Sequence, residues 1–200
     1  MALGYSSKLA TGSIPIWQGF PEQLAGGFLL ANTGLQEGTI LPAGSLVVYD
    51  EAARTATVLA TATAYATAGG SATTYQVAKG GSLKVGDYLA SGATGGKAYA
   101  ITAIDTTSSA VYDTITVGTT IGAVTAGDDL YASTATGATA SALPAANGLL
   151  YEDVRVEASG VKVSLSAVVR GTVYARRMPL YNANVAALTG LKFILFSQSK

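Results

Sequence analysis

The chain contains no cysteine and no histidine. Without cysteine it has no disulfide bond, no thiolate nucleophile and no thiolate ligand for a metal. Without histidine it lacks the side chain that most often acts as a general base at neutral pH and most often binds metals. A Ser-His-Asp triad is therefore excluded. We expect a protein that is not an enzyme, with no catalytic, cofactor-binding or metal-binding residues.

Charged residues are also scarce, at 12% of the 200 residues, about half the usual share in globular proteins. The formal net charge is zero, so no nucleic-acid partner is expected. Residues 1–150 carry five basic and nine acidic side chains (net −4), whereas residues 151–200 carry seven and three (net +4). Either chance or docking to another protein explains this division.

No long hydrophobic run is present. The most apolar stretch, LKFILF at 191–196, is far shorter than the roughly 20 residues that span a bilayer. The opening MALGYSSKLATG lacks the charged and apolar regions of a secretory signal. These features predict synthesis in the cytoplasm and no membrane partner.

The first forty residues are rich in Gly and Pro and follow no sustained period. Pro15 and Pro21 fix the backbone around several large apolar side chains. Such an arm packs either on its own domain or into a groove of another molecule. Its apolar candidates for an interface are Ile14, Ile16, Trp17 and Phe20.

The rest of the chain alternates between strand patterns and turns. Residues 41–60 predict strand, turn, strand. The pattern G-D-x-L occurs at Gly86 and again at Gly127, which predicts two equivalent turns entering strands. Alternating runs at 98–104 and 111–117 flank a Ser/Thr-rich turn and predict a hairpin.

The longest alternating run is at 161–175, where every odd position is apolar or Gly. This pattern predicts one strand with a buried face. Fifteen residues would extend about 50 Å, against a usual strand of 5 or 6 residues. Gly171 is expected to bend it. The edges of so long a strand need cover, which we expect neighbouring subunits to supply.

These patterns predict a mainly β fold of two small β-barrel or sandwich domains and one short C-terminal helix, from about Asn182 to Leu188. Residues 1–60 and 147–200 would form one β domain with the N-terminal arm. Residues 61–146 would form a second domain inserted into it. Two domains in continuous order explain the same composition.

Few side chains suggest chemistry. Asp105 and Asp113 flank a turn, where a pair of carboxylates could serve acid–base chemistry, but we interpret both as turn residues. The basic cluster near the C-terminus fits either a protein interface with Arg and Tyr anchors or solvent-exposed charge. Its candidate interface residues are Arg170, Tyr174, Arg176 and Arg177.

The C-terminal block resembles the head-fibre or capsid-decoration proteins of tailed bacteriophages. The matching segments are NGLLYEDVRV, VSLSAVVRGTVYARRMP and LTGLKFILF, and GTILPAGSLVVYDE near the front looks similar. The resemblance implies a non-enzymatic structural protein on the virion capsid surface, bound to the major capsid protein and to itself as a homotrimer. By the same resemblance the chain is made in the host cytoplasm, and residues 1–60 and 147–200 form the capsid-proximal domain. Residues 61–146 form the distal domain, which could meet a host-surface ligand. The alternatives are a tail-fibre or baseplate module, or a carbohydrate-binding β module using exposed Tyr99 or Tyr112.

Overall fold

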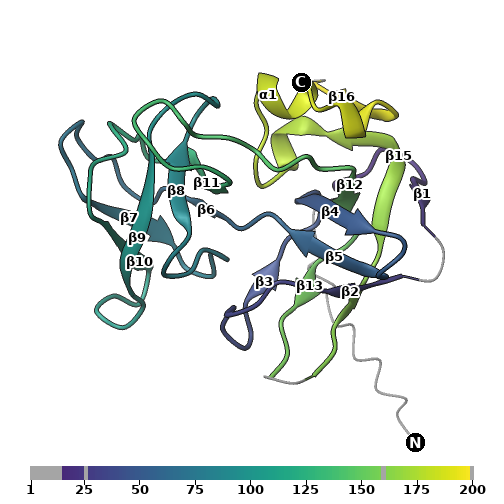
Figure 1. Cartoon of the computed structure of the whole chain (residues 1–200), viewed down its shortest axis with the longest axis horizontal. Coiled ribbons are helices and arrows are strands. Elements are labelled where there is room, and N and C mark those ends of the chain that lie inside the picture. Colours follow the sequence, from purple (N-terminus) through teal and green to yellow (C-terminus); the bar gives the residue numbers. More distant parts are fainter. Residues whose placement is uncertain (1–14, 25–26, 159–160, 199–200) are drawn as a thin grey trace, which may run out of the picture.

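The computed structural model describes residues 15–24, 27–158 and 161–198, and this part of the chain is built mainly from short strands (Figure 1). The strands are β1 (Glu22–Gln23), β2 (Phe28–Leu30), β3 (Ile40–Leu41), β4 (Leu46–Asp50), β5 (Thr55–Val58), β6 (Thr61–Thr63), β7 (Thr74–Ala78), β8 (Tyr88–Ser91), β9 (Ala98–Asp105), β10 (Tyr112–Val117), β11 (Asp129–Ser133), β12 (Gly148–Leu150), β13 (Val154–Arg155), β14 (Ser164–Leu165), β15 (Ala167–Tyr174) and β16 (Ile194–Ser197). The helical elements are α1 (Ala183–Ala186) and two 3₁₀ turns, η1 (Ala175–Arg177) and η2 (Thr189–Leu191). The predicted mainly β class and the short C-terminal helix are confirmed.

The strands form three sheets. One sheet has eight strands in the order β1-β15-β12-β4-β5-β2-β14, with β16 beside β15. A second has six strands in the order β6-β11-β8-β9-β10-β7, all from residues 61–133. β3 and β13 form a small third sheet. In Figure 1 the six-stranded sheet lies to the left and the other two lie to the right. The division into two domains, one inserted into the other, stays a prediction.

None of the sheets formed by the described residues closes into a barrel, so the barrel alternative of the fold prediction is wrong. In the six-stranded sheet the outer strands β6 and β7 meet at one isolated bridge, between Ala64 and Val77. β6 is only three residues long, and the loop after β7 forms hydrogen bonds with part of its free edge. Thr61 N–H donates to Ser82 Oγ at 2.9 Å, and Ser82 N–H donates to Thr61 O at 3.0 Å. The loop therefore occupies the place where β7 would complete a barrel.

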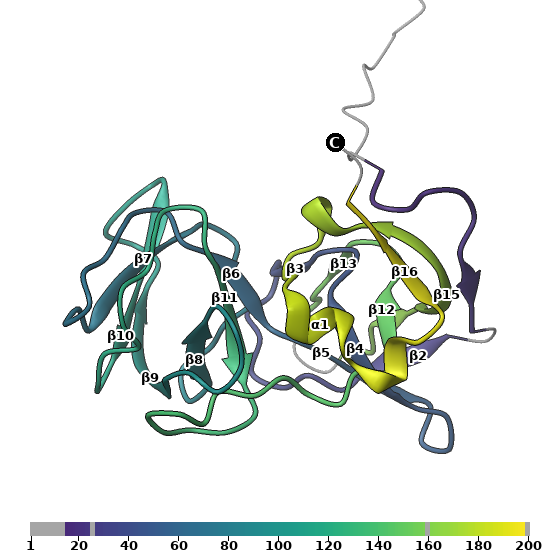
Figure 2. The same ribbon diagram turned by 90° about the horizontal axis from the view of Figure 1, so that it is seen from above.

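A shared hydrophobic core joins the six-stranded sheet to the eight-stranded sheet. Tyr131 on β11 and Ala98 on β9 belong to the same buried cluster as Leu46 on β4 and Leu149 on β12. Seen from above, β6 and β11 lie on the side of their sheet that faces the rest of the chain (Figure 2). A separate cluster fills the interior of the six-stranded sheet. Burial of Tyr131 therefore links the two parts.

The alternating run at 161–175 is not one long strand. It forms β14 and β15, and the two parts pair with different neighbours: β14 with β2, and β15 with β12. The alternation persists because both parts pack against buried clusters, but the sheet partner changes at Ser166. Gly171 has φ of +153°, and a Cβ there would lie 2.9 Å from Pro21 Cβ. A side chain at this position would therefore collide with the arm.

Candidate functional site

The N-terminal arm, residues 15–24, lies along one edge of β15. Gln18 N–H donates to Thr172 O at 2.9 Å, and Trp17 forms a bridge with Val173. β1, at the end of the arm, continues the pairing. The other edge of β15 is paired first with β12 and then with the parallel strand β16. The chain itself covers both edges of β15, so the expected cover by neighbouring subunits is not needed there.

Two of the predicted interface residues belong to the chain's own core. Ile16 is buried and lies against Gly44 and Met178, where the missing Cβ of Gly44 leaves room for it. The Trp17 ring stacks on Tyr151, with centroids 6.3 Å apart, and its Nε1–H donates to Tyr151 O at 2.7 Å. Both side chains thus anchor the arm to its own fold. Ile14 lies outside the described residues.

Phe20 has the opposite environment, because its side chain is fully exposed, at 103% of the reference area. It lies between Gln18, which bonds to Thr172, and Glu22, which pairs with Arg170. Gly19 has φ of +88° in this excursion, and a register shift follows between Glu22 and Gln23. The arm therefore leaves the sheet edge locally and presents a phenylalanine to solvent.

The C-terminal strand β16 and the residue before it contribute two more exposed apolar side chains. Phe193 and Leu195 are 64% and 65% exposed, and with Phe20 they are the three most exposed large apolar residues of the described chain. The Arg170 guanidinium carbon lies 5.2 Å from the Phe193 ring centroid, and Arg170 Nη1 lies 3.7 Å from Glu22 Oε2. We call these five residues the docking patch. Phe20 and Glu22 belong to the arm, Arg170 lies in β15, Leu195 lies in β16, and Phe193 directly precedes β16. The arm, β15 and β16 lie together in Figure 1.

The remaining predicted residues lie at the far end of β15. The Arg177 guanidinium carbon lies 4.6 Å from the Tyr174 ring centroid, and Arg177 donates to Pro15 O. Tyr174 N–H donates to Ile16 O at 2.9 Å. These contacts hold the start of the arm. Arg176 is exposed beside them. The structure thus places Arg170 beside Glu22 and Phe193, two residues along the arm from Phe20, and places Tyr174 and Arg177 separately.

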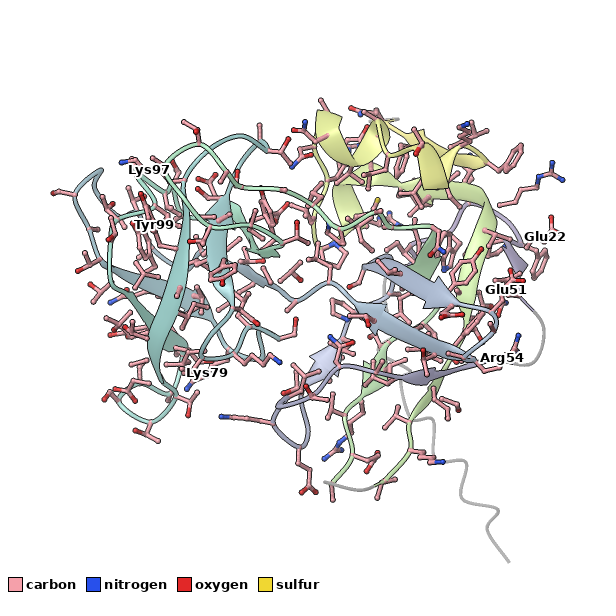
Figure 3. All side chains as sticks on the ribbon, in the orientation of Figure 1. Glu22, Glu51, Arg54, Lys79, Lys97 and Tyr99 are labelled. Atoms are coloured by element: carbon pink, nitrogen blue, oxygen red, sulfur yellow. The ribbon has the colours of Figure 1, made fainter. Side chains whose placement is uncertain are left out.

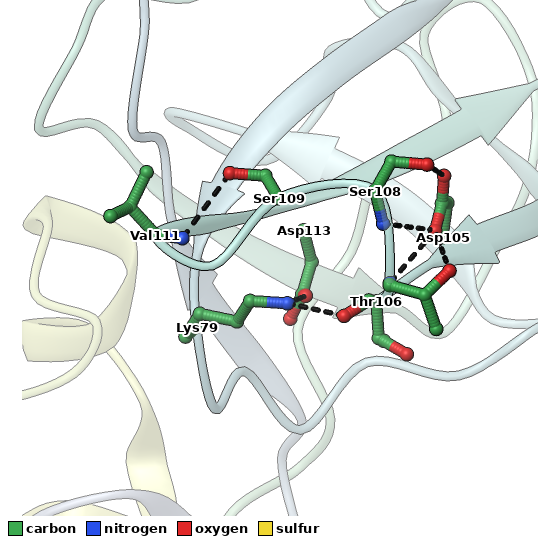
Figure 4. A network of polar contacts seen from close by, with 8 residues as sticks. Lys79, Asp105, Thr106, Ser108, Ser109, Val111 and Asp113 are labelled. Atoms are coloured by element: carbon green, nitrogen blue, oxygen red, sulfur yellow. Dashed lines mark hydrogen bonds and ion pairs between the residues drawn. The ribbon is translucent and has the colours of Figure 1, made fainter.

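A groove of about 640 Å³ runs between residues 33–39 and residues 79–85. At one side Lys79 Nζ lies 2.6 Å from Asp113 Oδ1 and donates to Thr106 O at 2.5 Å (Figure 4). Asp113 is buried in β10 and is not a turn residue. The pairing supplies the partner that a buried carboxylate needs. The Lys79 ammonium therefore has its ion-pair partner within the chain.

Asp105 and Asp113 do not form a catalytic pair. Asp105 lies directly opposite Thr114, so it shares a sheet face with Thr114, whereas Asp113 points to the other face. The Asp105 carboxylate accepts hydrogen bonds from Thr107 and Ser108 (Figure 4). These bonds, that of the Ser108 hydroxyl foremost, hold the pKa of Asp105 well below its usual range. As predicted, Asp105 shapes a turn.

Within residues 15–24, 27–158 and 161–198 there is no cluster of three or more potential metal-binding side chains. No helix in the same ranges is long and apolar enough to span a bilayer. No protein-family model, curated protein or solved structure matches the chain.

Phe193 and Leu195 were not among the predicted interface residues. In LKFILF, no polar residue alternates with the apolar ones from Phe193 to Phe196, and Ile194 is buried while Leu195 is exposed. A strand that is apolar on both faces is the signal that could have identified them.

Proposed function

We propose that the chain is a structural virion protein, a head-fibre or decoration protein that binds the outer capsid surface of a tailed bacteriophage as a homo-oligomer. The trimer is the expected form. The part built from residues 1–60 and 147–200 would face the capsid, and residues 61–146 would point outward. The sequence resemblance supports the virion assignment, and the docking patch supports assembly.

The docking patch is the observation that carries this proposal. Phe20, Phe193 and Leu195 together expose roughly 400 Å² of side chain, taking about 200 Å² for a phenylalanine. A stable interface buries about 800 Å² on each partner around an apolar centre with a polar rim. The patch would supply such a centre, worth about 10 kcal/mol before the cost of association.

A second copy of the chain is a suitable partner for this patch. Arg170 and Glu22 lie within it and are both about two-thirds exposed, so a symmetric neighbour could exchange this loose ion pair for a pair across the interface. β16 adds an edge, because in the described chain it pairs only with β15. An open edge beside exposed apolar side chains favours association.

Light scattering of the purified full-length chain tests assembly. We expect a mass of about 60 kDa for the wild type, three times the 20.1 kDa of one chain. The double variant F193S/L195S should shift the mass toward that of one chain. V111S is the matched control, because Val111 is 57% exposed but lies outside the patch. A wild type that stays at the monomer mass up to high micromolar concentration contradicts the assembly proposal.

Fractionated virions test the location. Heads and tails are separated on a gradient and analysed by mass spectrometry, and we expect the chain in the head fraction. When the purified chain is added to heads from which the chain has been removed, we expect it to bind to the heads again. Recovery from tails alone would reject the capsid assignment and favour the tail-fibre alternative.

A further inference from the structure

A second exposed site lies on the outer face of the six-stranded sheet. Tyr112 on β10 lies opposite Ala78 on β7, and Thr114 lies opposite Gln76. Tyr65, just after β6, donates its N–H to Gln76 O at 2.9 Å. Alternation directs the intervening Asp113, Tyr75 and Val77 to the interior, where they are buried. The side chains of Tyr65, Gln76, Tyr112 and Thr114 form what we call the tyrosine face.

The two tyrosine rings of this face lie together across β7. Their centroids are 5.3 Å apart and their planes are inclined by 31°. Tyr112 lies opposite a residue as small as Ala78, which leaves space for the neighbouring ring of Tyr65. Tyr65 remains 48% exposed. The pair thus forms an aromatic surface that the described chain leaves partly uncovered.

The polar atoms of the tyrosine face have no hydrogen-bond partner within the part of the chain that the structure describes. This holds for the Gln76 amide and for the hydroxyls of Tyr65 and Tyr112. The neighbouring Tyr75 shows the contrast, because its buried hydroxyl donates to Ala72 O at 2.7 Å and accepts from Ile121 N–H at 3.1 Å. The same sheet therefore has one tyrosine satisfied in the core and two with hydroxyls available to a ligand.

Charge contributes little at this face. Asp105 on β9 lies directly opposite Thr114. Its carboxylate oxygens, however, already accept hydrogen bonds from Thr107 and Ser108. The ammonium of Lys79 is bonded to Asp113. A ligand that relied on ionic contacts would find few here. Nucleic acid, whose affinity comes mainly from phosphate contacts with Lys and Arg, is disfavoured for that reason.

We propose that the tyrosine face binds a neutral oligosaccharide. The apolar C–H face of a pyranose ring would pack on the tyrosine rings, and sugar hydroxyls would bond to the Gln76 amide and the tyrosine hydroxyls, which both donate and accept. The site goes beyond the proposed assembly and is independent of it. Figure 3 shows the labelled Glu22 of the docking patch and Tyr99 of the six-stranded sheet at opposite ends of the molecule.

An array of immobilised neutral and sialylated oligosaccharides, probed with the purified full-length chain, tests the proposal. We expect retention on at least one neutral oligosaccharide. In titrations with that oligosaccharide, Tyr65→Ala and Tyr112→Ala should each weaken binding by roughly tenfold. Tyr65→Phe, which keeps the ring, should weaken it less. Gln76→Ala provides a variant that leaves both rings in place and should also weaken binding.

L195S is the matched control, because it alters the docking patch and should leave oligosaccharide binding unchanged. Conversely, Tyr65→Ala should leave the light-scattering mass unchanged. Each variant is checked for a cooperative thermal transition. The proposal is overturned if no neutral oligosaccharide is retained, if only sialylated ones are, or if folded Tyr65→Ala and Gln76→Ala variants bind as the wild type does.

Discussion

Replacement of Gly171 by alanine tests whether the arm packs on β15. Gly171 has φ of +153°, and an added Cβ would lie 2.9 Å from Pro21 Cβ and 3.2 Å from Pro21 Cα. A non-glycine residue in such a conformation costs about 1–3 kcal/mol. The close contact adds a further cost, because Pro21 belongs to the arm's backbone and cannot move alone. We expect G171A to lower the free energy of unfolding by about 2–4 kcal/mol.

Gly80→Ala is the matched control for this prediction. Gly80 also has positive φ, at +83°, but a Cβ there would meet nothing within 4 Å. G80A should therefore lower the free energy of unfolding by only about 1–2 kcal/mol. The difference between the two variants measures the cost of displacing the arm. Both values come from urea denaturation analysed as a two-state transition.

The single tryptophan reports on the arm in the same experiment. Trp17 is the only tryptophan of the chain, and it stacks on Tyr151. If G171A displaces the arm, Trp17 emission should shift toward longer wavelengths before global unfolding, whereas G80A should leave it unchanged. Packing of the arm against Gly171 is contradicted if G171A is no more destabilising than G80A and leaves the Trp17 emission as it is in the wild type.

Two further predictions concern polar groups that are partly or fully buried. Burial raises the pKa of Asp87, although the hydrogen bond and charge of Lys84 oppose this. The folded state then holds this proton more tightly than the unfolded state, so this group's contribution to stability rises as pH falls through its folded pKa. D87N keeps an acceptor for Lys84 N–H and should be more stable than the wild type at pH 7, with an advantage that shrinks toward pH 4 in urea denaturation; a constant difference would contradict this. Tyr131 is fully buried, and its hydroxyl lies near the Ser141 side chain without forming a well-aligned hydrogen bond. In thermal and urea unfolding Tyr131→Ala should therefore cost about 3–5 kcal/mol, and Tyr131→Phe should be neutral or stabilising by up to about 1 kcal/mol. A large loss in Tyr131→Phe would reveal a partner for the hydroxyl.

Local features of the fold could be predicted from the sequence. The repeated Gly-Asp pairs form equivalent turns: Gly86 and Gly127 have φ of +95° and +93°. The Asp that follows each glycine accepts from the backbone N–H three residues earlier, at 3.0 and 2.7 Å. The hairpin β9–β10 lies where alternation predicted it. Asn182 caps α1 through its side chain. Each of these depends on residues close together in the sequence.

The candidate sites could be predicted only in part. Phe20 and Arg170 were identified from residue type and position, and Tyr112 was named as a candidate for sugar binding. Their partners, Phe193 and Tyr65, were not. Phe193 is 23 residues from Arg170, and Tyr65 is 47 residues from Tyr112. Nothing in the spacing predicts that each pair meets, because the contact depends on which strands are neighbours in a sheet.

The β class, the turns and the buried face of the alternating strands follow from the sequence, because side-chain alternation and glycine or asparagine chemistry act within a few residues. The tertiary structure decided which strands pair. It placed the arm on β15, split the 161–175 run between β2 and β12, and left β16 at an edge. The physical reason is that backbone N–H and C=O groups are alike at almost every residue, so alternation specifies a face but not a neighbour. The neighbour is selected by packing in the shared core.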